Sequence, residues 1–335
     1  MKVLIVSQPE VALLLPMQEC MSAMAEALET LARGEAILPL RQVLLLPGGI
    51  GAFAVMPAYL GSPRAIGVKA ITVFPGNHGT EYDSHQGAVL LFESERGRLL
   101  AIMDASSITA IRTAAVSGVA TRLLAREDAG DLAILGTGVQ ARTHLEAMLL
   151  ARRIRRVRVF SRDPDQVRVF AERAAKRHGI AVEAAPRARD AVAGADIICT
   201  TTSSGEPVLL GEWIAPGAHV NAVGASLPTA RELDTAAVVR SRLFVDRRES
   251  ALNEAGDFLV PRREGAIGDD HIRAEIGEVL LGSRPGRQSP DEITLFKSLG
   301  LAIEDVASAH LIHANALKVG VGTWVELGGA RDTTA

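Results

Sequence analysis

Apolar and polar positions divide the chain into two stretches with different patterns. Between Arg41 and Leu100, short apolar runs such as "RQVLLLPG", "GVKAITVFPG" and "GAVLLFES" are separated by Gly, Pro, Asn and Asp, which favour turns. This pattern predicts a mostly β module. A strand at "KVLIVS" and a helix over residues 16–33 precede it, and the methionines of that helix fall at helical spacing, which indicates a side that faces the core.

From residue 108 onward, apolar runs alternate with amphipathic segments. A helix over residues 108–126 is followed by predicted strands, which lie at residues 132–135, 157–161, 182–184, 197–202, 219–223 and 243–245. Helices are predicted between the first three strands, at residues 139–150 and 164–178. The alternation favours an α/β fold with a doubly wound parallel sheet, which binds its ligands at the carboxyl ends of the strands.

A further helical pattern after Leu301 returns the chain toward its first part. Two domains are therefore predicted: a mixed α+β domain of residues 1–115 with 310–335, and a Rossmann domain of residues 116–309. The length of 335 residues agrees with two hydrophobic cores rather than one. The polar stretch over residues 261–270 is expected to be a surface loop.

Composition argues against several classes of protein. Hydrophobic residues make up 48% of the chain and charged residues 22%, as in soluble proteins, and the net charge of -3 gives no bias toward nucleic acid. Cys20 and Cys199 are too few for a disulfide framework and match no metal-ligand spacing, so a reducing, cytoplasmic setting is expected. The residues "SQPE" interrupt the apolar N-terminus, so neither a signal peptide nor a membrane span is predicted.

The segment "LAILGTGVQARTHLEAML", residues 132–149, has the features of a dinucleotide-binding loop. Gly136, Gly138 and Ala141 satisfy the G-x-G-x-x-G/A pattern between a predicted strand and a predicted helix. The first glycine permits the tight turn, the second lets the backbone approach the pyrophosphate, and the alanine lets helix and strand pack closely. Free amides at the start of the helix would bind the negative charge.

The end of the second strand indicates which dinucleotide is bound. An NAD site commonly has Asp or Glu there for the ribose hydroxyls, whereas this chain has Ser161 and Arg162. A guanidinium pairs with a 2′-phosphate, which a carboxylate would repel, so NADPH is the predicted cofactor. Asp163 and Asp165 lie near enough in sequence to leave NADH use open, and an ordinary solvated position is the alternative interpretation of Arg162.

Seven segments together resemble the ornithine cyclodeaminase and mu-crystallin family, in the family's order and from Arg41 to Ala309. They are "LPLR", "GVKAIT", "SHQGAVLLFE", "ITAIRTAAVSGVAT", "GTGVQA", "PGAHVNAVGASLPTARELD" and "LFKSLGLAIEDVASA". The resemblance implies an NAD(P)-dependent oxidoreductase that is a homodimer. It also implies that the first domain supplies the substrate pocket and the subunit contact, and that the second is the Rossmann domain.

The resemblance also assigns candidate residues to the site. It implies that Arg41, Lys69 and Arg112 gather around the substrate carboxylate and the nicotinamide. A guanidinium can bind a carboxylate through two hydrogen bonds, and a lysine in a closed pocket can donate a proton as well as charge. Without the matching segments around it, each of the three would be interpreted as a surface charge.

One position separates the chemistries within this family. Cyclodeaminases have "NAVGGD", in which the aspartate serves as an acid/base group, whereas this chain reads "NAVGAS" and has Ser226 there. A neutral hydroxyl cannot act as a general base at neutral pH, although it can orient an imine or a water; an ordinary turn serine is the alternative. The pattern is similar to the ketimine reductase branch. That branch implies NADPH-dependent reduction of a cyclic imino acid, Δ1-pyrroline-2-carboxylate or Δ1-piperideine-2-carboxylate, to L-proline or L-pipecolate.

Two other functions stay open at this stage. One is an ornithine cyclodeaminase or an alanine dehydrogenase-like oxidoreductase, and the other is a non-catalytic, mu-crystallin-like binding protein, because the same residues would serve binding and turnover. The resemblance implies further cofactor contacts at Ser84, Arg112, Thr113, Val139, Gln140, Thr202, Val223 and Ser298. Glu254 matches an acidic position of the mu-crystallin branch, but a surface carboxylate is an equally good interpretation. The chemistry requires no metal.

Overall fold

The computed structural model describes residues 2–77 and 79–329. The chain divides into two compact units, which are Met1–Arg112 with Leu301–Ala335 (unit 1) and Thr113–Gly300 (unit 2). The second segment of unit 1 begins at Leu301, earlier than the expected residue 310. The reason is that the whole of helix α11 (Ala302–Val319) belongs to unit 1, where it packs on the sheet.

A mixed sheet forms the centre of unit 1. Its strand order is β16-β1-β7-β6-β5-β4-β2, and β3 pairs with β4. The strands are β1 (Lys2–Val6), β2 (Ala36–Ile37), β3 (Gln42–Leu45), β4 (Ala52–Gly61), β5 (Arg64–Val73), β6 (His85–Phe92), β7 (Leu99–Asp104) and β16 (Thr323–Glu326). β4 to β7 form an antiparallel meander, and β1 joins β7 in parallel.

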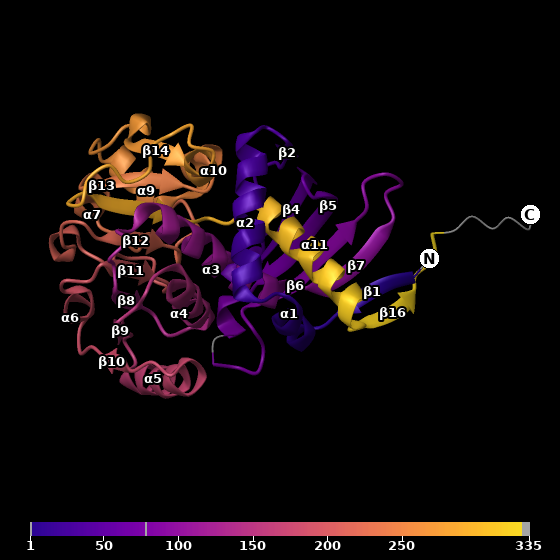
Figure 1. Ribbon diagram of the computed structural model, residues 1–335, viewed down its shortest axis with the longest axis horizontal. Coiled ribbons are helices and arrows are strands. Elements are labelled where there is room, and N and C mark those ends of the chain that lie inside the picture. Colours follow the sequence, from indigo (N-terminus) through magenta and orange to yellow (C-terminus); the bar gives the residue numbers. More distant parts are fainter. Residues whose placement is uncertain (1, 78, 330–335) are drawn as a thin grey trace, which may run out of the picture. The chain divides into compact units, whose positions relative to one another are not determined.

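Helix α11 packs against one face of this sheet, across β4, β5 and β6 (Figure 1). The other helices of unit 1 are α1 (Gln8–Leu14), α2 (Met17–Ala32) and the first part of α3 (Ala105–Leu124). Helix α11 approaches β5 closely because Gly67 has no side chain: a Cβ there would lie 2.7 Å from Val306 Cγ2. Met17, Met21 and Met24 of α2 are buried, which confirms the predicted core side of that helix.

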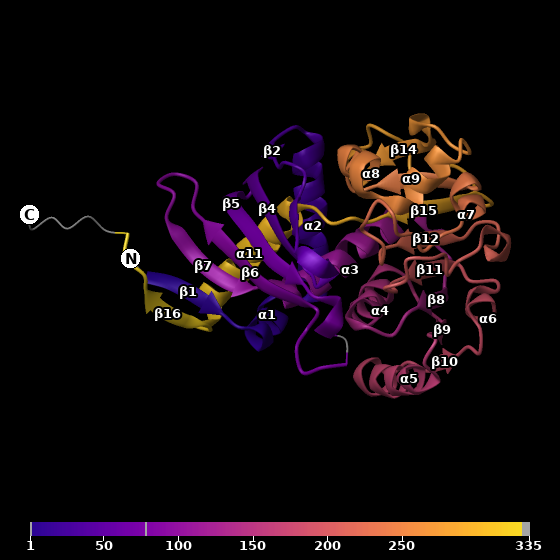
Figure 2. The same cartoon turned by 180° about the vertical axis from the view of Figure 1, so that it is seen from behind.

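The opposite face of the same sheet is apolar and partly accessible, and Figure 2 shows the strands from behind. In strand register, Pro57, Val68, Leu90 and Ile102 form one row across β4, β5, β6 and β7. All four are half-buried, whereas the residues on either side of each are buried. This alternation is the period of two expected when successive side chains point to opposite faces of a sheet.

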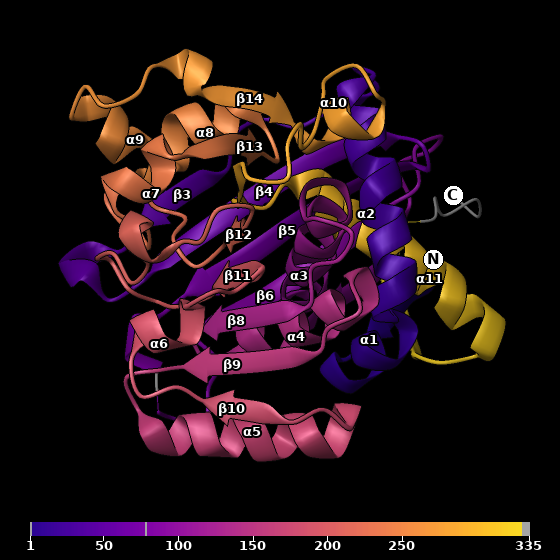
Figure 3. The same cartoon turned by 60° about the vertical axis from the view of Figure 1, so that its left-hand side comes forward.

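A parallel sheet forms the centre of unit 2, in the order β10-β9-β8-β11-β12-β15-β13-β14. Its strands are β8 (Asp131–Leu135), β9 (Arg156–Phe160), β10 (Val182–Ala184), β11 (Ile197–Thr200), β12 (His219–Ala222), β13 (Ser241–Val245), β14 (Ile272–Glu275) and β15 (Ile293–Lys297). Each pairing between neighbours is parallel, and Figure 3 shows β8, β9 and β10 pointing the same way. The carboxyl ends of all eight strands therefore lie at one edge.

The predicted α/β class is confirmed in unit 2, where β8 to β13 coincide with the six predicted strands to within two residues at each end. The helices are α4 (Val139–Ala151), α5 (Pro164–His178), α6 (Ala188–Val192), α7 (Thr235–Val239), α8 (Arg248–Glu254), α9 (Gly256–Arg263) and α10 (Ile276–Leu280). The prediction of a surface loop over residues 261–270 was wrong for its first three residues. Helix α9 runs through Pro261 to Arg263, because its apolar side with Phe258 is buried in the core.

The structure also bears on membrane association. Across residues 2–77 and 79–329, no single helix is both long and apolar enough to cross a bilayer, although the bent pair α1 and α2 passes a test of length and composition when the two are joined.

Candidate active site

A buried cluster of charged side chains links β5, α3 and α11 inside unit 1. Lys69 on β5 and Arg112 on α3 are 2% and 4% exposed. Lys69 Nζ lies 2.8 Å from Asp305 Oδ2, and Arg112 Nε donates to the other oxygen of that carboxylate, Oδ1, at 3.1 Å. Arg112 Nη1 also donates to Glu304 Oε2 at 2.7 Å. Asp305 therefore bridges the two cations that the sequence predicted to act together.

The charges of this cluster explain how two cations can be buried. Lys69 and Arg112 carry two positive charges, and Glu304 and Asp305 carry two negative charges, so the four side chains are together neutral. Burial lowers the pKa of Lys69 to about 8, while Asp305 opposes that shift and Arg112 and Arg41 add to it. Arg41, which precedes β3 and is half-buried, is therefore near enough to act on the same site.

The sequence interpretation missed the two acids of this cluster. Glu304 and Asp305 open helix α11, where acidic residues are usual because they interact favourably with the helix dipole. The available signal was their position, since they are adjacent charges on a helix whose neighbouring positions are apolar. Lys69 Nζ also lies 3.4 Å from Thr109 Oγ1, which was not predicted either.

The remaining candidates near this cluster in sequence are Ser84 and Thr113. Ser84 is half-buried in the loop before β6, and its carbonyl accepts a hydrogen bond from Phe74 N at 2.8 Å. Thr113 follows Arg112 on α3 and is buried. Neither side chain carries a charge, and their expected contacts with the cofactor stay predictions.

The glycine loop of unit 2 has the geometry of a phosphate-binding turn. Gly136 directly follows β8 with φ 118°, and a Cβ there would lie 2.9 Å from the carbonyl oxygen of Thr201. Gly138 is the N-cap of α4, and a Cβ on it would meet nothing within 4 Å. Val139 and Gln140 form the first turn of a 13-residue helix that has no capping side chain. Backbone amides at the start of such a helix can bind an anion.

The loop after β9 presents the predicted cation to solvent. Ser161 is half-buried and Arg162 is exposed directly beyond the end of the strand. Asp163 is the N-cap of α5, and its Oδ1 accepts hydrogen bonds from the amides of Asp165 and Gln166 at 3.0 and 3.3 Å. The carboxylate of Asp163 is therefore engaged in capping, whereas Arg162 follows β9 as a 2′-phosphate ligand would.

Three further loops follow the carboxyl ends of neighbouring strands. Thr202 follows β11, Val223 and Ser226 follow β12, and Ser298 follows β15. Ser226 is exposed, while Ser298 is 2% exposed and its Oγ has no hydrogen-bond partner among the described residues. A buried hydroxyl without a partner favours a ligand at that position. The loop geometry and this hydroxyl fit a dinucleotide at the edge where the glycine loop lies.

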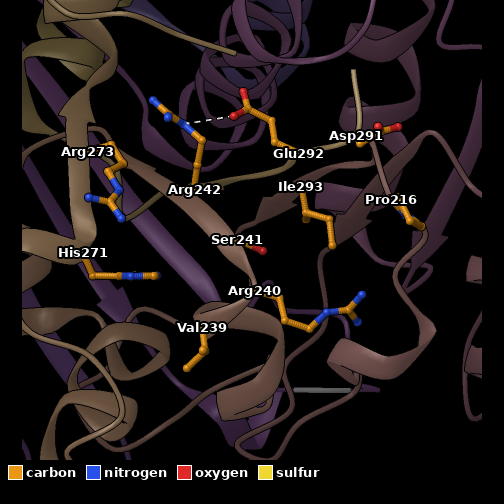
Figure 4. A pocket seen from close by; sticks show the side chains of 10 residues that line it. All are labelled: Pro216, Val239, Arg240, Ser241, Arg242, His271, Arg273, Asp291, Glu292 and Ile293. Atoms are coloured by element: carbon orange, nitrogen blue, oxygen red, sulfur yellow. Dashed lines mark ion pairs between the residues drawn. The ribbon is translucent and has the colours of Figure 1, made fainter. Parts of the chain in front are cut away.

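A cavity of about 480 Å³ lies elsewhere in unit 2, where β13, β14 and β15 begin (Figure 4). It is lined by Pro216, Val239, Arg240, Ser241, Arg242, His271, Arg273, Asp291, Glu292 and Ile293. Arg242 Nε is 3.4 Å from Glu292 Oε2, while Arg240 and Arg273 donate to main-chain carbonyls. This cavity is therefore at the opposite edge of the sheet from the glycine loop, and its cations are engaged.

Two remaining expectations concern Glu254 and metals. Glu254 is the last residue of α8 and is half-buried, and its expected role stays a prediction. Within residues 2–77 and 79–329, no group of three or more His, Cys, Asp or Glu side chains is arranged to hold a metal ion.

The fold and site together define a dinucleotide-binding α/β protein with a second unit that buries paired cations. The chain belongs to the ornithine cyclodeaminase/mu-crystallin family, whose model matches residues 1–320. It is 42% identical over 280 residues to the ketimine reductase mu-crystallin of Mus musculus, covering 84% of this chain and 85% of that protein. It is 36% identical over 324 residues to a Δ1-pyrroline-2-carboxylate reductase of Bacillus cereus, covering 96% of this chain and 99% of that protein.

Two solved structures of similar proteins have the same fold as this chain. The Δ1-pyrroline-2-carboxylate reductase of Thermococcus litoralis, in complex with NADH and L-proline, matches with a TM-score of 0.94 and 40% identity, covering 96% of this chain and 99% of that chain. An archaeal alanine dehydrogenase dimer with bound NAD matches with a TM-score of 0.92 and 35% identity, covering 98% of this chain and 100% of that chain. Both relatives hold a nicotinamide dinucleotide, which agrees with the cofactor class predicted from the glycine loop.

Proposed function

We propose that this protein reduces a cyclic imino acid, Δ1-pyrroline-2-carboxylate or Δ1-piperideine-2-carboxylate, to L-proline or L-pipecolate. The observation that carries the proposal is the buried bridge of Lys69, Asp305 and Arg112, which offers a cation and a proton donor in one place. A cyclic imino acid needs both, because it has one carboxylate to bind and one C=N nitrogen to protonate. Similarity to ketimine and pyrroline-2-carboxylate reductases supports the same reaction.

Charge balance supports the assignment of the carboxylate site. The four buried charges of the cluster cancel, so an arriving substrate carboxylate needs one further positive charge. Arg41 supplies it in this proposal. Glu304 and Asp305 hold Arg112 by Nη1 and Nε, and these two contacts fix the plane of its guanidinium for a carboxylate at the remaining nitrogen.

Lys69 has the properties of the proton donor. Its pKa of about 8, lowered by burial, leaves the ammonium mostly protonated at neutral pH and makes it a better acid than an exposed lysine. In the proposed step, Lys69 Nζ gives a proton to the imine nitrogen, and Asp305 stabilises the ammonium beforehand. The C=N double bond becomes a C–N single bond, with a new C–H bond at the carbon that accepts the hydride and a new N–H bond at the nitrogen that accepts the proton.

The cofactor residues fit a reduced nicotinamide dinucleotide in unit 2. When bound, NADPH supplies the hydride that the imine carbon accepts. Gly136, Gly138 and the first turn of α4 would hold the pyrophosphate, and Arg162 would hold the 2′-phosphate. Asp163 is occupied as a helix cap, which favours NADPH over NADH.

Ser226 supports reduction over cyclodeamination. It is exposed at the carboxyl end of β12, and its hydroxyl can orient an imine or a water but cannot serve as a general base at neutral pH. Cyclodeaminases have an aspartate at this position as an acid/base group. This chain lacks that carboxylate, so ornithine cyclisation with loss of ammonia would have no acid/base group here.

An NADPH-oxidation assay with both imino acids, repeated with NADH, tests cofactor, reaction and ring size together. We expect turnover with at least one imine and a lower Michaelis constant for NADPH than for NADH. Alanine and ornithine with NAD⁺ serve as the comparison reactions. Ammonia release from ornithine without imine turnover would refute the proposal, and NADPH binding without any turnover would favour a binding protein.

A homodimer formed by the accessible sheet face of unit 1 is proposed as well. The row Pro57, Val68, Leu90 and Ile102 is apolar across four strands, and such a face is unusual on a monomer. A second copy of the chain is the partner that fits, because a two-fold axis brings the same apolar row against itself. The similar alanine dehydrogenase is a dimer, which supports this choice of partner.

A further inference from the structure

A second buried network lies in unit 2, and the reaction scheme above does not use it. Its centre is Glu232, which is fully buried and precedes α7. Glu232 Oε1 accepts hydrogen bonds from the amide and the hydroxyl of Thr202, both at 2.7 Å. Glu232 Oε2 accepts from Thr200 Oγ1 at 2.7 Å and from the amide of Gly224 at 2.6 Å. One carboxylate therefore ties the loop after β11 to the loop after β12.

These two loops touch at Gly224. A Cβ on Gly224 would lie 2.1 Å from the carbonyl oxygen of Thr202 and 2.6 Å from Glu232 Oε1. The loops therefore cannot separate or slide without breaking the hydrogen bonds to Glu232. Burial raises the pKa of the Glu232 carboxyl, while hydrogen bonds from Thr202 and Thr200 and the charge of Lys297 lower it.

A buried ion pair extends the network to the strand β15. Asp257 Oδ1 accepts hydrogen bonds from the amides of Glu232 and Leu233 at 2.8 and 3.0 Å. Asp257 Oδ2 lies 2.8 Å from Lys297 Nζ, and both side chains are at most 2% exposed. Lys297 Nζ also donates to the carbonyl oxygen of Ala225, the residue before Ser226. Lys297 itself precedes Ser298.

We propose that Glu232 is a positioning residue for the cofactor edge: it fixes Thr202 and the loop of Ser226 in one arrangement before any ligand binds. The proposal rests on the cofactor and substrate roles proposed above for these loops. In this proposal Glu232 acts through the residues that it binds, Thr200, Thr202 and Gly224. Its effect is preorganisation, because loops already held in the binding geometry lose less conformational entropy when the ligand arrives.

Asp196 provides a matched control within the same sheet. Its carboxylate also accepts two backbone hydrogen bonds, from Gly130 and Asp131 at 2.8 and 3.0 Å, and it pairs with Arg126. It precedes β11, so it lies at the amino edge of the sheet rather than the cofactor edge. A substitution at Asp196 therefore reports what losing a hydrogen-bonded carboxylate does to stability alone.

The test compares Glu232→Gln with Asp196→Asn by thermal unfolding and by NADPH titration, read from nicotinamide fluorescence without substrate. The amides of Thr202 and Gly224 donate to different oxygens of the Glu232 carboxylate. A glutamine has only one side-chain oxygen, so one of these two amides would lose its acceptor. We expect both variants to unfold at lower temperature. Only Glu232→Gln should raise the Kd for NADPH, by about tenfold, because binding must then also order the two loops. An unchanged Kd in Glu232→Gln, or an equal rise in Asp196→Asn, would overturn the proposal.

A measurement on the unsubstituted protein covers the case in which Glu232→Gln does not fold. NADPH should slow hydrogen exchange of the amides of Thr202 and Gly224, because binding closes the openings that release them, and leave those of Gly130 and Asp131 unchanged. Equal or absent slowing at both edges would overturn the positioning role. Neither experiment uses imine turnover, so failure of the proposed reaction would be seen separately.

Discussion

Replacing Asp305 with Asn removes the anion shared by Lys69 and Arg112 while keeping its shape. Lys69 Nζ and Arg112 Nε lie 2.8 and 3.1 Å from this carboxylate, and all three side chains are buried. The four-residue cluster would change from neutral to a net charge of about +1. Removing one partner of a buried ion pair costs about 3 kcal/mol or more, because the remaining charge stays desolvated. We expect a fall in Tm of about 10 °C.

The same substitution should move the pH dependence of the reaction. In the proposed reaction Lys69 is the proton donor, so kcat/KM should be flat at lower pH and should fall as pH rises through about 8. The charge of Asp305 raises the pKa of Lys69, so its removal lowers that pKa. The descending limb of Asp305→Asn should therefore lie at lower pH than that of the unsubstituted protein. Steady-state imine reduction across pH 5–10 measures this shift.

Glu304→Gln is the control for this experiment. Glu304 contacts Arg112, and no contact that we describe joins it to Lys69, so its loss should also lower Tm but leave the limb near pH 8. Titration of the imine itself is common to all three proteins and cancels in the comparison. The reasoning is refuted if Asp305→Asn keeps its limb where the unsubstituted protein has it, or if Glu304→Gln shifts it equally.

Three further outcomes are expected. Arg162→Ala should raise the KM for NADPH about tenfold and leave that for NADH within about twofold; equal effects on both would contradict a 2′-phosphate contact. Gly136→Ala should weaken NADPH binding measured by fluorescence, because its φ of 118° is strained for alanine and its Cβ would lie 2.9 Å from Thr201; unchanged affinity would contradict this. Val68→Lys should give monomers in light scattering, whereas Val319→Lys, at the exposed last residue of α11, should not; a Val68→Lys dimer would refute the proposed face.

The sequence predicted the parts of the fold that depend on local pattern. Most of β8 to β13 were found because they are apolar runs bounded by turn residues, and the glycine loop was found because its spacing has a steric cause. β14 and β15 were missed: "IRAE" is short and mixes apolar with charged residues, and "ITLFK" ends in a lysine that is buried only because Asp257 pairs with it.

Of the buried charged clusters, the sequence predicted only the cations Lys69 and Arg112. Arg112 and Asp305 are separated by 193 positions, and Lys297 and Ala225 by 72. A single sequence does not show which acidic residue pairs with which basic residue across such sequence separations, because the pairing depends on how the strands and helices pack. The resemblance supplied Lys69 and Arg112, whereas Asp305, Glu304 and Glu232 became visible only from their contacts.

The origin of α11 in the last part of the chain has a consequence for biosynthesis. The ribosome completes β5, the first part of α3 and all of unit 2 before it makes Asp305. Until then, Lys69 and Arg112 lack the acids that allow their burial, and β4, β5 and β6 lack the helix that covers them. Unit 2 can therefore fold during translation, as domains usually do in order of synthesis, while Lys69 and Arg112 are enclosed only after α11 has been made.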